Sequence, residues 1–470
     1  MKNDSLKFKM SLSIALRYFE EAIWYIFLFS FPFQRRMILY QQDWNFNEWR
    51  SMALYGSDLV FIGLMVFWVF HKQHQKASLG WVDIWLGAFF IIAAASVFQY
   101  QDWWLGIYNL LRLGQGIVLY YYISRYAAHR FQLFLSFLAF IGGGVFQAIL
   151  GIWQFLVQHD LGLRILGESV LNPQMRGVAV FYNFVGDKVM RAYGTFPHPN
   201  VLAAYLLTAL FAFYYVYLQK DKIKEGSGQK AVGRKSILNY LLLSALCLLL
   251  FAFFLTFART TIFVWVLAMM GMSVYFYRKH KEVWPDWRKV LIATGIITVL
   301  FVGIFWQDVA ARILISSQDE AVQLRIFFNQ QALGSGHGGL NINWLGIGIG
   351  NFVSWFMETR PYLNPYLYQP AHNIYLLIYA ELGIFGLFSF LAFLVALLIS
   401  NFQLRKSTLI PYSLFLILCM LFIGLFDHFP WTIQQGRLLF WGVLGLFSGT
   451  LSRSKSAPSV GGQRMNLGRD

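Results

Sequence analysis

Two short polar segments stand at the starts of long apolar stretches and carry residue types that can do chemistry. The first, Arg-Ala-Tyr-Gly-Thr-Phe-Pro-His-Pro-Asn, occupies 191–200, and the second, Pro-Ala-His-Asn, occupies 370–373. Arginine, histidine and asparagine are costly near lipid, so their placement at the mouths of apolar helices indicates a site there. A further arginine, Arg259, lies in a short turn between two apolar runs.

His372 has the chemistry of a general base, because imidazole titrates near neutral pH. Asn373 adds a polar group beside it, and Glu381 follows about two and a half turns deeper in the same expected helix. A carboxylate inside a membrane span is a candidate functional group. The alternative is that His372 only caps its helix or lies at the membrane interface.

Arg191 and Arg259 have the chemistry of anion ligands, since the planar guanidinium matches phosphate with two parallel hydrogen bonds. In the first segment, His198 and Asn200 supply donors and capping groups, and the following helix N-terminus itself favours phosphate. If both arginines open onto the same side as His372, the site binds a dianion, and a lipid diphosphate is the obvious membrane-borne candidate. The alternative for Arg259 is an interfacial arginine that extends its charge to water.

The composition predicts the elements that must position these residues. The 470 residues are 58% hydrophobic and only 13% charged, whereas soluble domains are about 25% charged. Many apolar runs reach about 20 residues, which predicts an all-α polytopic membrane protein with about twelve transmembrane helices and a large extracytoplasmic loop. The expected spans are 14–33, 52–71, 80–98, 103–124, 131–156, 200–218, 237–257, 260–277, 290–306, 373–399, 409–426 and 431–451.

The distribution of lysine and arginine predicts the orientation. The connections on the side of the two termini hold more than twice as many of these residues as the opposite connections, so both termini are expected in the cytoplasm. On the outer side every such residue but Lys188 is an arginine, which topology alone does not require. The expected organisation is an N-terminal helical part (1–156), a central helical part (157–306) with an outer loop (157–199), a large extracytoplasmic loop (307–372), C-terminal helices (373–451) and a basic cytoplasmic tail (452–470).

Several classes of function are disfavoured by what the chain carries. The net charge of +16 is accounted for by the topology signal and by anionic lipid headgroups, so no nucleic-acid partner is expected. The two cysteines exclude a disulfide framework, and no His, Asp or Glu cluster has metal-ligand spacing, so we expect no metal and no cofactor. The glycine-rich stretch at 345–352 lacks the βαβ context of a dinucleotide site.

These motifs resemble the O-antigen ligase and polymerase superfamily of bacterial membrane glycan transferases. The matching features are the 191–200 segment before a span, the Phe-Ala-Arg259-Thr turn, Arg325 upstream of the 345–352 stretch, and Ala-His372-Asn373-Ile-Tyr-Leu followed by Ala-Glu381-Leu-Gly. The resemblance covers roughly 190–400. One departure is the arginine turn, which more often reads Ser-Arg-Gly or Ser-Arg-Ser and here reads Ala-Arg-Thr.

The resemblance implies a bacterial inner-membrane enzyme with its active site on the extracytoplasmic face. Its donor would be an undecaprenyl-diphosphate-linked glycan, and its acceptor a lipid A–core sugar, as in lipopolysaccharide biosynthesis, a second glycan, or a protein side chain. Arg191 and Arg259 would bind the diphosphate and His372 would handle the acceptor or leaving group, with support from His198, Asn200, Arg325, Asn373 and Glu381. A lipid-linked glycan transporter or flippase is the competing class, although no internal repeat is evident, and a protein O-oligosaccharyltransferase also remains open.

Overall fold

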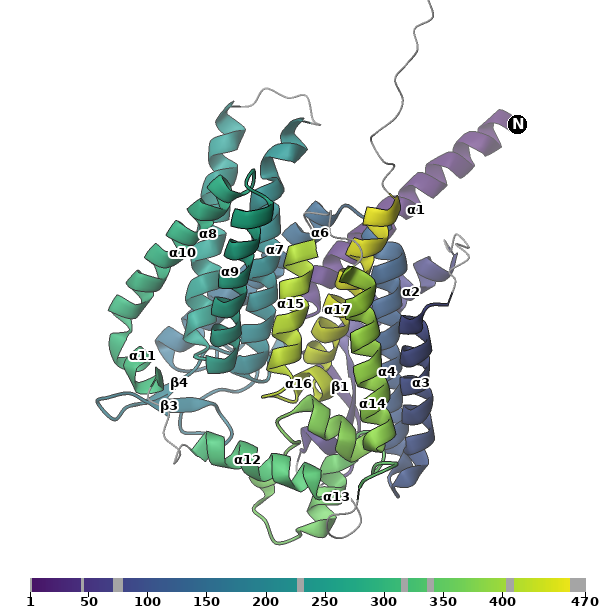
Figure 1. Cartoon of the computed structure of the whole chain (residues 1–470), viewed down its shortest axis with the longest axis vertical. Coiled ribbons are helices and arrows are strands. Elements are labelled where there is room, and N and C mark those ends of the chain that lie inside the picture. The colour runs from purple at the N-terminus through teal and green to yellow at the C-terminus, as the bar shows by residue number, and fades with distance from the viewer. Residues whose placement is uncertain are drawn as a thin grey trace, which may run out of the picture.

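The computed structural model describes residues 2–43, 46–70, 79–225, 232–313, 320–335, 342–402 and 410–456. These residues are mostly helical, and every range expected to span a membrane overlaps a long helix that runs alongside its neighbours in one bundle (Figure 1). The long helices are α1 (Lys2–Ser30), α2 (Gly56–Phe70), α3 (Trp81–Ser96), α4 (Trp103–Tyr122), α6 (Leu133–Val157), α7 (Pro199–Glu225), α8 (Val232–Leu255), α9 (Arg259–Lys279), α10 (Trp284–Ile304), α14 (Ile374–Phe402), α15 (Ile410–Ile423) and α17 (Gln434–Ser456). Of the expected basic tail, residues 457–470 lie outside the described residues.

Within the described residues, six helical segments are long and apolar enough to cross a membrane. They are Trp81–Gln99, Leu133–Val157, Pro199–Lys220, Arg259–Lys279, Trp284–Ile304 and Ile374–Ser400, and shorter apolar helices occupy Gly56–Phe70, Asn239–Leu255 and Pro411–Ile423. The helical class is therefore confirmed, while the count of about twelve spans stays a prediction. Helices such as α1, with Glu20 and Glu21, and α4, with Arg112, carry charges that weaken their apolar signal.

Besides the helices, two small antiparallel sheets that the sequence did not predict occur in the connections. Strand β1 (Arg36–Gln41) pairs with β2 (Ser51–Tyr55), and β3 (Val180–Tyr182) pairs with β4 (Lys188–Met190). Both pairs lie at the end of the bundle that also holds the shorter helices (Figure 1). Outside the helices the backbone still needs hydrogen-bond partners, and short hairpins supply them.

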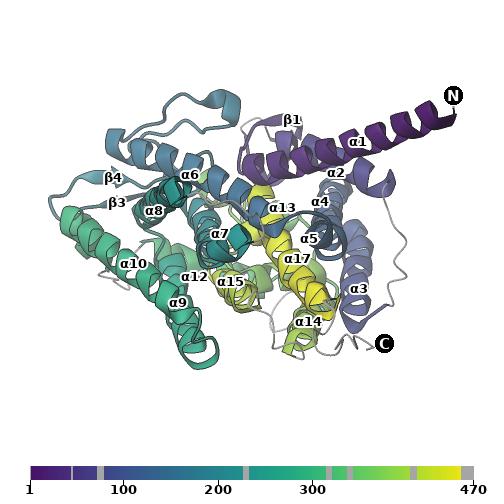
Figure 2. The same cartoon turned by 90° about the horizontal axis from the view of Figure 1, so that it is seen from above.

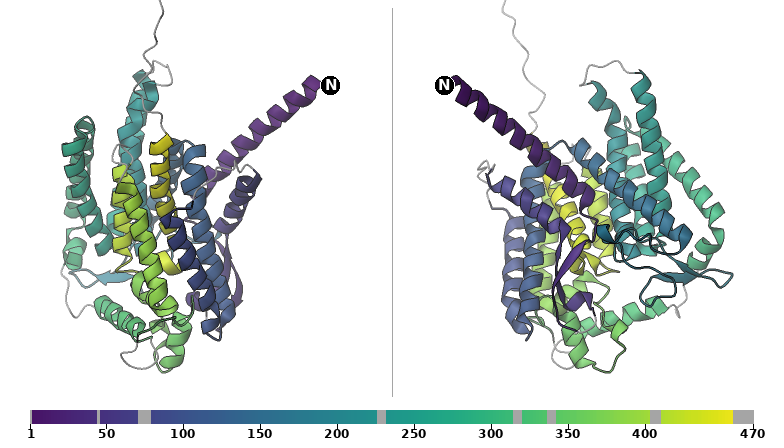
Figure 3. Two further views of the ribbon diagram at one scale, coloured as in Figure 1. Left: turned by 45° about the vertical axis from the view of Figure 1, so that its right-hand side comes forward. Right: turned by 180° about the vertical axis from the view of Figure 1, so that it is seen from behind.

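The shorter helical elements complete that end of the molecule. They are α11 (Trp306–Ile313), α12 (Glu320–Leu333), α13 (Phe352–Thr359) and α16 (Phe429–Thr432), with single turns η1 (Glu48–Arg50), η4 (Arg164–Leu166) and η5 (Pro365–Leu367), whereas η2 (Val97–Gln99), η3 (Ile123–Ala127) and α5 (Ala128–Arg130) continue the long helices. Helix α12 lies across the bundle end (Figure 1). In the other direction α1 leans out of the bundle (Figure 3).

Helix α7 forms the centre of the core. Its apolar window is 83% buried inside the bundle, and α6, α8, α9, α15 and α17 all contact it. The view along the bundle shows α7 enclosed by these neighbours (Figure 2). A helix that is apolar all round is stable only when buried in this way. The 191–200 segment leads directly into α7, so the most rigid part of the fold holds it.

Helix α14 is broken at Gly383, where φ is +69°. The glycine-rich stretch at 345–352 fills the break: the Ile347 amide donates to the Ala380 carbonyl (3.0 Å) and the Gly348 amide to the Glu381 carbonyl (2.9 Å). A Cβ on Gly346 would lie 2.1 Å from the Glu381 carbonyl oxygen, and one on Gly383 would lie 2.2 Å from the Trp344 oxygen. The glycines therefore serve close backbone approach.

Candidate functional site

Two glutamines of α6 hold the 191–200 segment. Gln154 Oε1 accepts a hydrogen bond from the Gly194 amide (2.7 Å), and its Nε2 donates to the Gly194 carbonyl (2.9 Å). About two helical turns earlier on the same face of α6, Gln147 Oε1 accepts from the Thr195 amide (2.8 Å) and its Nε2 donates to Thr195 Oγ1 (2.9 Å). These buried contacts fix the backbone that presents Arg191 on one side and His198 on the other.

Arg191 is nearly fully buried and has specific partners. Its Nε donates to the Thr256 carbonyl (2.5 Å) and its Nη2 to Asn200 Oδ1 (2.7 Å). Asn200 in turn donates from Nδ2 to Asp427 Oδ2 (2.6 Å). Burial, followed by the nearby charge of Arg312, lowers the pKa of Arg191 to about 9. The guanidinium is therefore charged at neutral pH, and a bound anion would stabilise this buried charge.

The turn before Arg259 directs carbonyl groups toward arginines. Phe257 has φ of +46°, which is uncommon for an aromatic residue. Thr256 beside it accepts from Arg191, and the Phe257 carbonyl accepts from Arg312 Nη2 (3.5 Å). Arg259 then begins α9. Strained backbone of this kind is concentrated at functional sites.

His372 stands just before α14. Its ring stacks on Phe328 of α12 (centroids 5.5 Å apart, planes at 16°) and meets the ring of His428 edge-on at 4.9 Å. Among the described residues its Nδ1 has no hydrogen-bond partner. Desolvation and the neighbouring His428 lower the pKa of His372 to about 3, so the imidazole is neutral at neutral pH. A neutral, held imidazole with an uncommitted nitrogen can accept a proton.

Asp427 and His428 join the site, although sequence reasoning passed over them. They lie between α15 and α16, and Asp427 Oδ1 accepts from the His428 amide (2.9 Å). His428 Nδ1 lies 2.7 Å from Thr432 Oγ1. Burial would raise the pKa of Asp427, whereas the adjacent histidines and Arg325 lower it, and the net direction is downward. The available signal was an acid and a histidine together between two apolar runs, the same kind of signal that marked His372.

His198 caps the N-terminus of α7. Its Nδ1 accepts from the Asn200 amide (3.2 Å), so the proton of the neutral ring resides on Nε2. Burial and the charge of Arg191 lower the pKa of His198 to about 3. His198 therefore behaves as a neutral group that stiffens the segment beside Arg191 and that faces the cavity.

One cavity of about 890 Å³ brings these groups together. Its wall includes six of the residues singled out from the sequence: Arg191, His198, Asn200, Arg259, Arg325 and His372. It also includes Arg176, Arg312, Asp427 and His428. Ligand sites commonly have about 300–1,000 Å³. Five arginines and two carboxylates, Asp427 and Glu48, line this space. The electrostatic character of the wall is therefore that of an anion site with neutral histidines at its edge.

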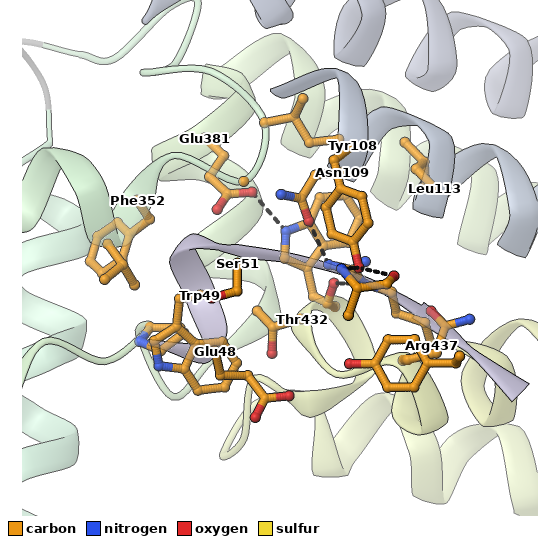
Figure 4. Close-up of a pocket in the computed structure, with 18 of the residues that line it drawn as sticks. Glu48, Trp49, Ser51, Tyr108, Asn109, Leu113, Phe352, Glu381, Thr432 and Arg437 are labelled. Carbon is orange, nitrogen blue, oxygen red and sulfur yellow. Dashed lines mark hydrogen bonds between the residues drawn. The ribbon is translucent and has the colours of Figure 1, made fainter. Parts of the chain in front are cut away.

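Asn373 and Glu381 are placed elsewhere. Asn373 Oδ1 accepts from the Tyr375 and Leu376 amides (2.9 and 3.1 Å), which is a helix N-cap. Glu381 faces a second, smaller cavity of about 60 Å³, where its carboxylate accepts from Trp431 Nε1 at 2.8 Å (Figure 4). Arg437 lines the same small cavity and is hydrogen-bonded to Asn109. Neither Asn373 nor Glu381 lines the large cavity.

Comparison with known proteins finds a family match over part of the chain. Residues 244–391 match the family model described as O-antigen ligase. This confirms the resemblance of the chain to the O-antigen ligase superfamily. The matched stretch contains Arg259, Arg325 and His372, whereas Arg191, which lines the same cavity, lies outside it. No curated protein was found to match the chain.

Proposed function

We propose that the protein is an O-antigen ligase-like or polymerase-like membrane glycan transferase. It moves a polyprenyl-diphosphate-linked oligo- or polysaccharide onto an acceptor hydroxyl of a lipid, a glycan or a protein, on the extracytoplasmic side of the bacterial inner membrane. The observation that carries the proposal is the large cavity in which Arg191, Arg259 and Arg325 face the neutral His372. The family match supports an enzyme of this general class.

In the proposed reaction the arginines bind the diphosphate of the donor. The acceptor oxygen attacks the anomeric carbon of the glycan, and a new carbon–oxygen bond forms there. The bond from that carbon to the phosphate oxygen breaks, and polyprenyl diphosphate leaves with the electron pair. His372 accepts the proton of the acceptor hydroxyl, as a general base does. Charge on the leaving group is stabilised by the arginines, which is electrostatic catalysis.

In this proposal Asn200 and Asp427 position the guanidinium of Arg191. Asn200 bridges Arg191 and Asp427 with hydrogen bonds of 2.7 and 2.6 Å. Asp427 thereby orients the amide of Asn200, and Asn200 orients the guanidinium of Arg191. Both are positioning residues in this proposal. Glu381 and Asn373 act further away, through the structure of α14.

Transfer by the purified full-length protein tests the proposal. A polyprenyl-diphosphate glycan is mixed with candidate acceptors, and His372→Ala is compared with the wild type. We expect His372→Ala to abolish transfer and to retain donor binding, because the arginines remain. Because the proposed steps use only protein groups, EDTA should leave the wild-type rate unchanged. A His372→Ala protein that transfers normally would overturn the base assignment, and loss of donor binding would place His372 in the diphosphate site instead.

A further inference from the structure

The β3–β4 hairpin has an unusual turn. Between the strands, Asn183 and Gly186 enclose Phe184 and Val185, whose side chains are 56% and 70% exposed. Turns normally place glycine, proline, asparagine, aspartate or serine at such positions. Phe184 and Val185 at the tip therefore form an exposed apolar surface, and contact of that surface with water is unfavourable.

Three N–H groups of this turn are paired within it. Asn183 Oδ1 accepts from the Val185 amide (3.1 Å) and from the Asp187 amide (2.8 Å). The Gly186 amide donates to the Asn183 carbonyl (3.0 Å). These pairings lower the cost of moving the turn from water into the headgroup layer, because N–H groups that are already paired do not need water as a partner.

Contact with Trp306, the first residue of α11, fixes the height of the turn. Phe184 packs against Trp306, with ring centroids 6.5 Å apart, directly after α10 ends at Ile304. Trp306 is itself 57% exposed. α10 qualifies as a membrane span, and one side of it exposes Ile296, Val299, Leu300 and Ile304. The apolar surface of the hairpin tip therefore continues the lipid-facing surface of a span beyond its end, where interfacial aromatic residues belong.

The views agree with this placement. In Figure 1 the β3–β4 hairpin lies crosswise to the bundle at the level of α11 and extends sideways past it. The view from behind shows the same lateral projection (Figure 3). We propose that the Phe184–Val185 turn inserts into the headgroup layer of the outer leaflet and docks this side of the protein on lipid. Asp187 at the end of the turn and Lys188 at the start of β4 keep the insertion shallow.

Docking of the hairpin on lipid would also position the large cavity, because the residues that lead into β3 form part of the cavity wall. Val178, Ala179 and Val180 line the cavity, and the Arg191 amide donates to the Ala179 carbonyl (3.2 Å). A hairpin held in the headgroup layer sets the arginine wall at the depth of a lipid phosphate. The membrane contact itself does not depend on the transferase reaction, so it is tested without an activity assay.

The test uses single cysteines in the full-length protein with Cys247 and Cys419 replaced by alanine. Bimane is attached at Phe184→Cys or Val185→Cys, and the protein is placed in nanodiscs, which expose both membrane faces. The matched control is Tyr362→Cys, since Tyr362 is 99% exposed in the segment between α13 and η5. Quenching is measured with a phospholipid that carries a nitroxide on its headgroup and with iodide in the water.

We expect several-fold stronger quenching by the lipid nitroxide at 184 and 185 than at 362, and the reverse order with iodide. Two positions are tested so that one poorly behaved variant cannot decide the outcome. Labels at 184 and 185 that respond like the label at 362 would overturn the proposal.

Discussion

At the residue scale, Arg191 differs from a surface arginine because it is buried and hydrogen-bonded. Its Nε and one Nη are used by Thr256 and Asn200, and repulsion from Arg312 adds to the cost of burial. The fork geometry is thus needed both to hold the side chain and to meet a phosphate. A lysine has one charged point and no fork, so it cannot do both.

We therefore expect Arg191→Lys and Arg259→Lys to lose transfer activity by at least about ten-fold, because a hydrogen bond to a charged group is worth about 1.5–3 kcal/mol. Arg360→Lys is the control, since Arg360 is exposed and does not line the cavity. Initial rates on membranes containing equal amounts of each protein give the comparison. Near wild-type rates for both cavity variants would mean that the arginines are structural.

The pH dependence of the reaction tests the state of His372. Its ring faces His428, Asp427, Arg325 and His198, and in the empty cavity its pKa is about 3. Only the neutral ring is a base, so activity falls as pH drops through that pKa. From roughly pH 5 to 8, kcat/KM, which reports the free enzyme, should then show no acid limb from His372.

Donor binding should change this pKa. Two negative charges beside the arginines favour the protonated imidazole, so the pKa of His372 rises in the donor complex. The acid limb of kcat, which reports the complex, is expected at higher pH than that of kcat/KM. Steady-state rates across this range measure both. Coincident limbs near pH 6.5, the ordinary value for histidine, would contradict the model of an electrostatically tuned base.

At the element scale, the hydrogen bonds from α6 to the 191–200 segment hold the backbone that carries Arg191 and His198. Gln154 pairs with Gly194 through both atoms of its amide, inside the bundle. Gln154→Leu would leave buried backbone groups without partners, at about 1–3 kcal/mol for each. We expect a lower unfolding temperature in detergent and a large loss of transfer. Gln99→Leu, at an exposed position, is the control and should change neither. Unchanged transfer in Gln154→Leu would show that the segment does not need these hydrogen bonds.

The same elements show what the sequence could and could not predict. Apolar length predicted the helices, and the polar residues at their mouths predicted which side chains to consider, because both signals are local. The pairing of Gln147 and Gln154 with the segment, and the arrival of Asp427 beside Asn200, join positions far apart in the chain. Such contacts follow from helix packing, which no local pattern encodes. For Glu381 the sequence predicted the helix but not the surroundings of the side chain. Those surroundings depend on the break of α14 at Gly383 and on the hydrogen bond from Trp431.

At the scale of the whole molecule, the large cavity lies at the bundle end that holds β1–β4, α12 and α13. Every role proposed for its residues requires that this end be extracytoplasmic. The lysine and arginine distribution predicts this orientation. The end of α9, with Arg278 and Lys279, and the following turn, with Lys281, would then be cytoplasmic. Each end of the bundle has an exposed residue, Tyr362 at one and Lys281 at the other, so the two ends can be labelled separately.

A cysteine at Tyr362 should react with a membrane-impermeant thiol reagent in intact cells, after any outer membrane is permeabilised, and one at Lys281 should react only after the inner membrane is opened. Tyr362 suits this test because it is 99% exposed. The cysteine-to-alanine background removes reaction at the native thiols. Because the donor diphosphate and the base must meet on one side of the membrane, the opposite labelling pattern would refute the orientation and the proposed extracytoplasmic reaction together.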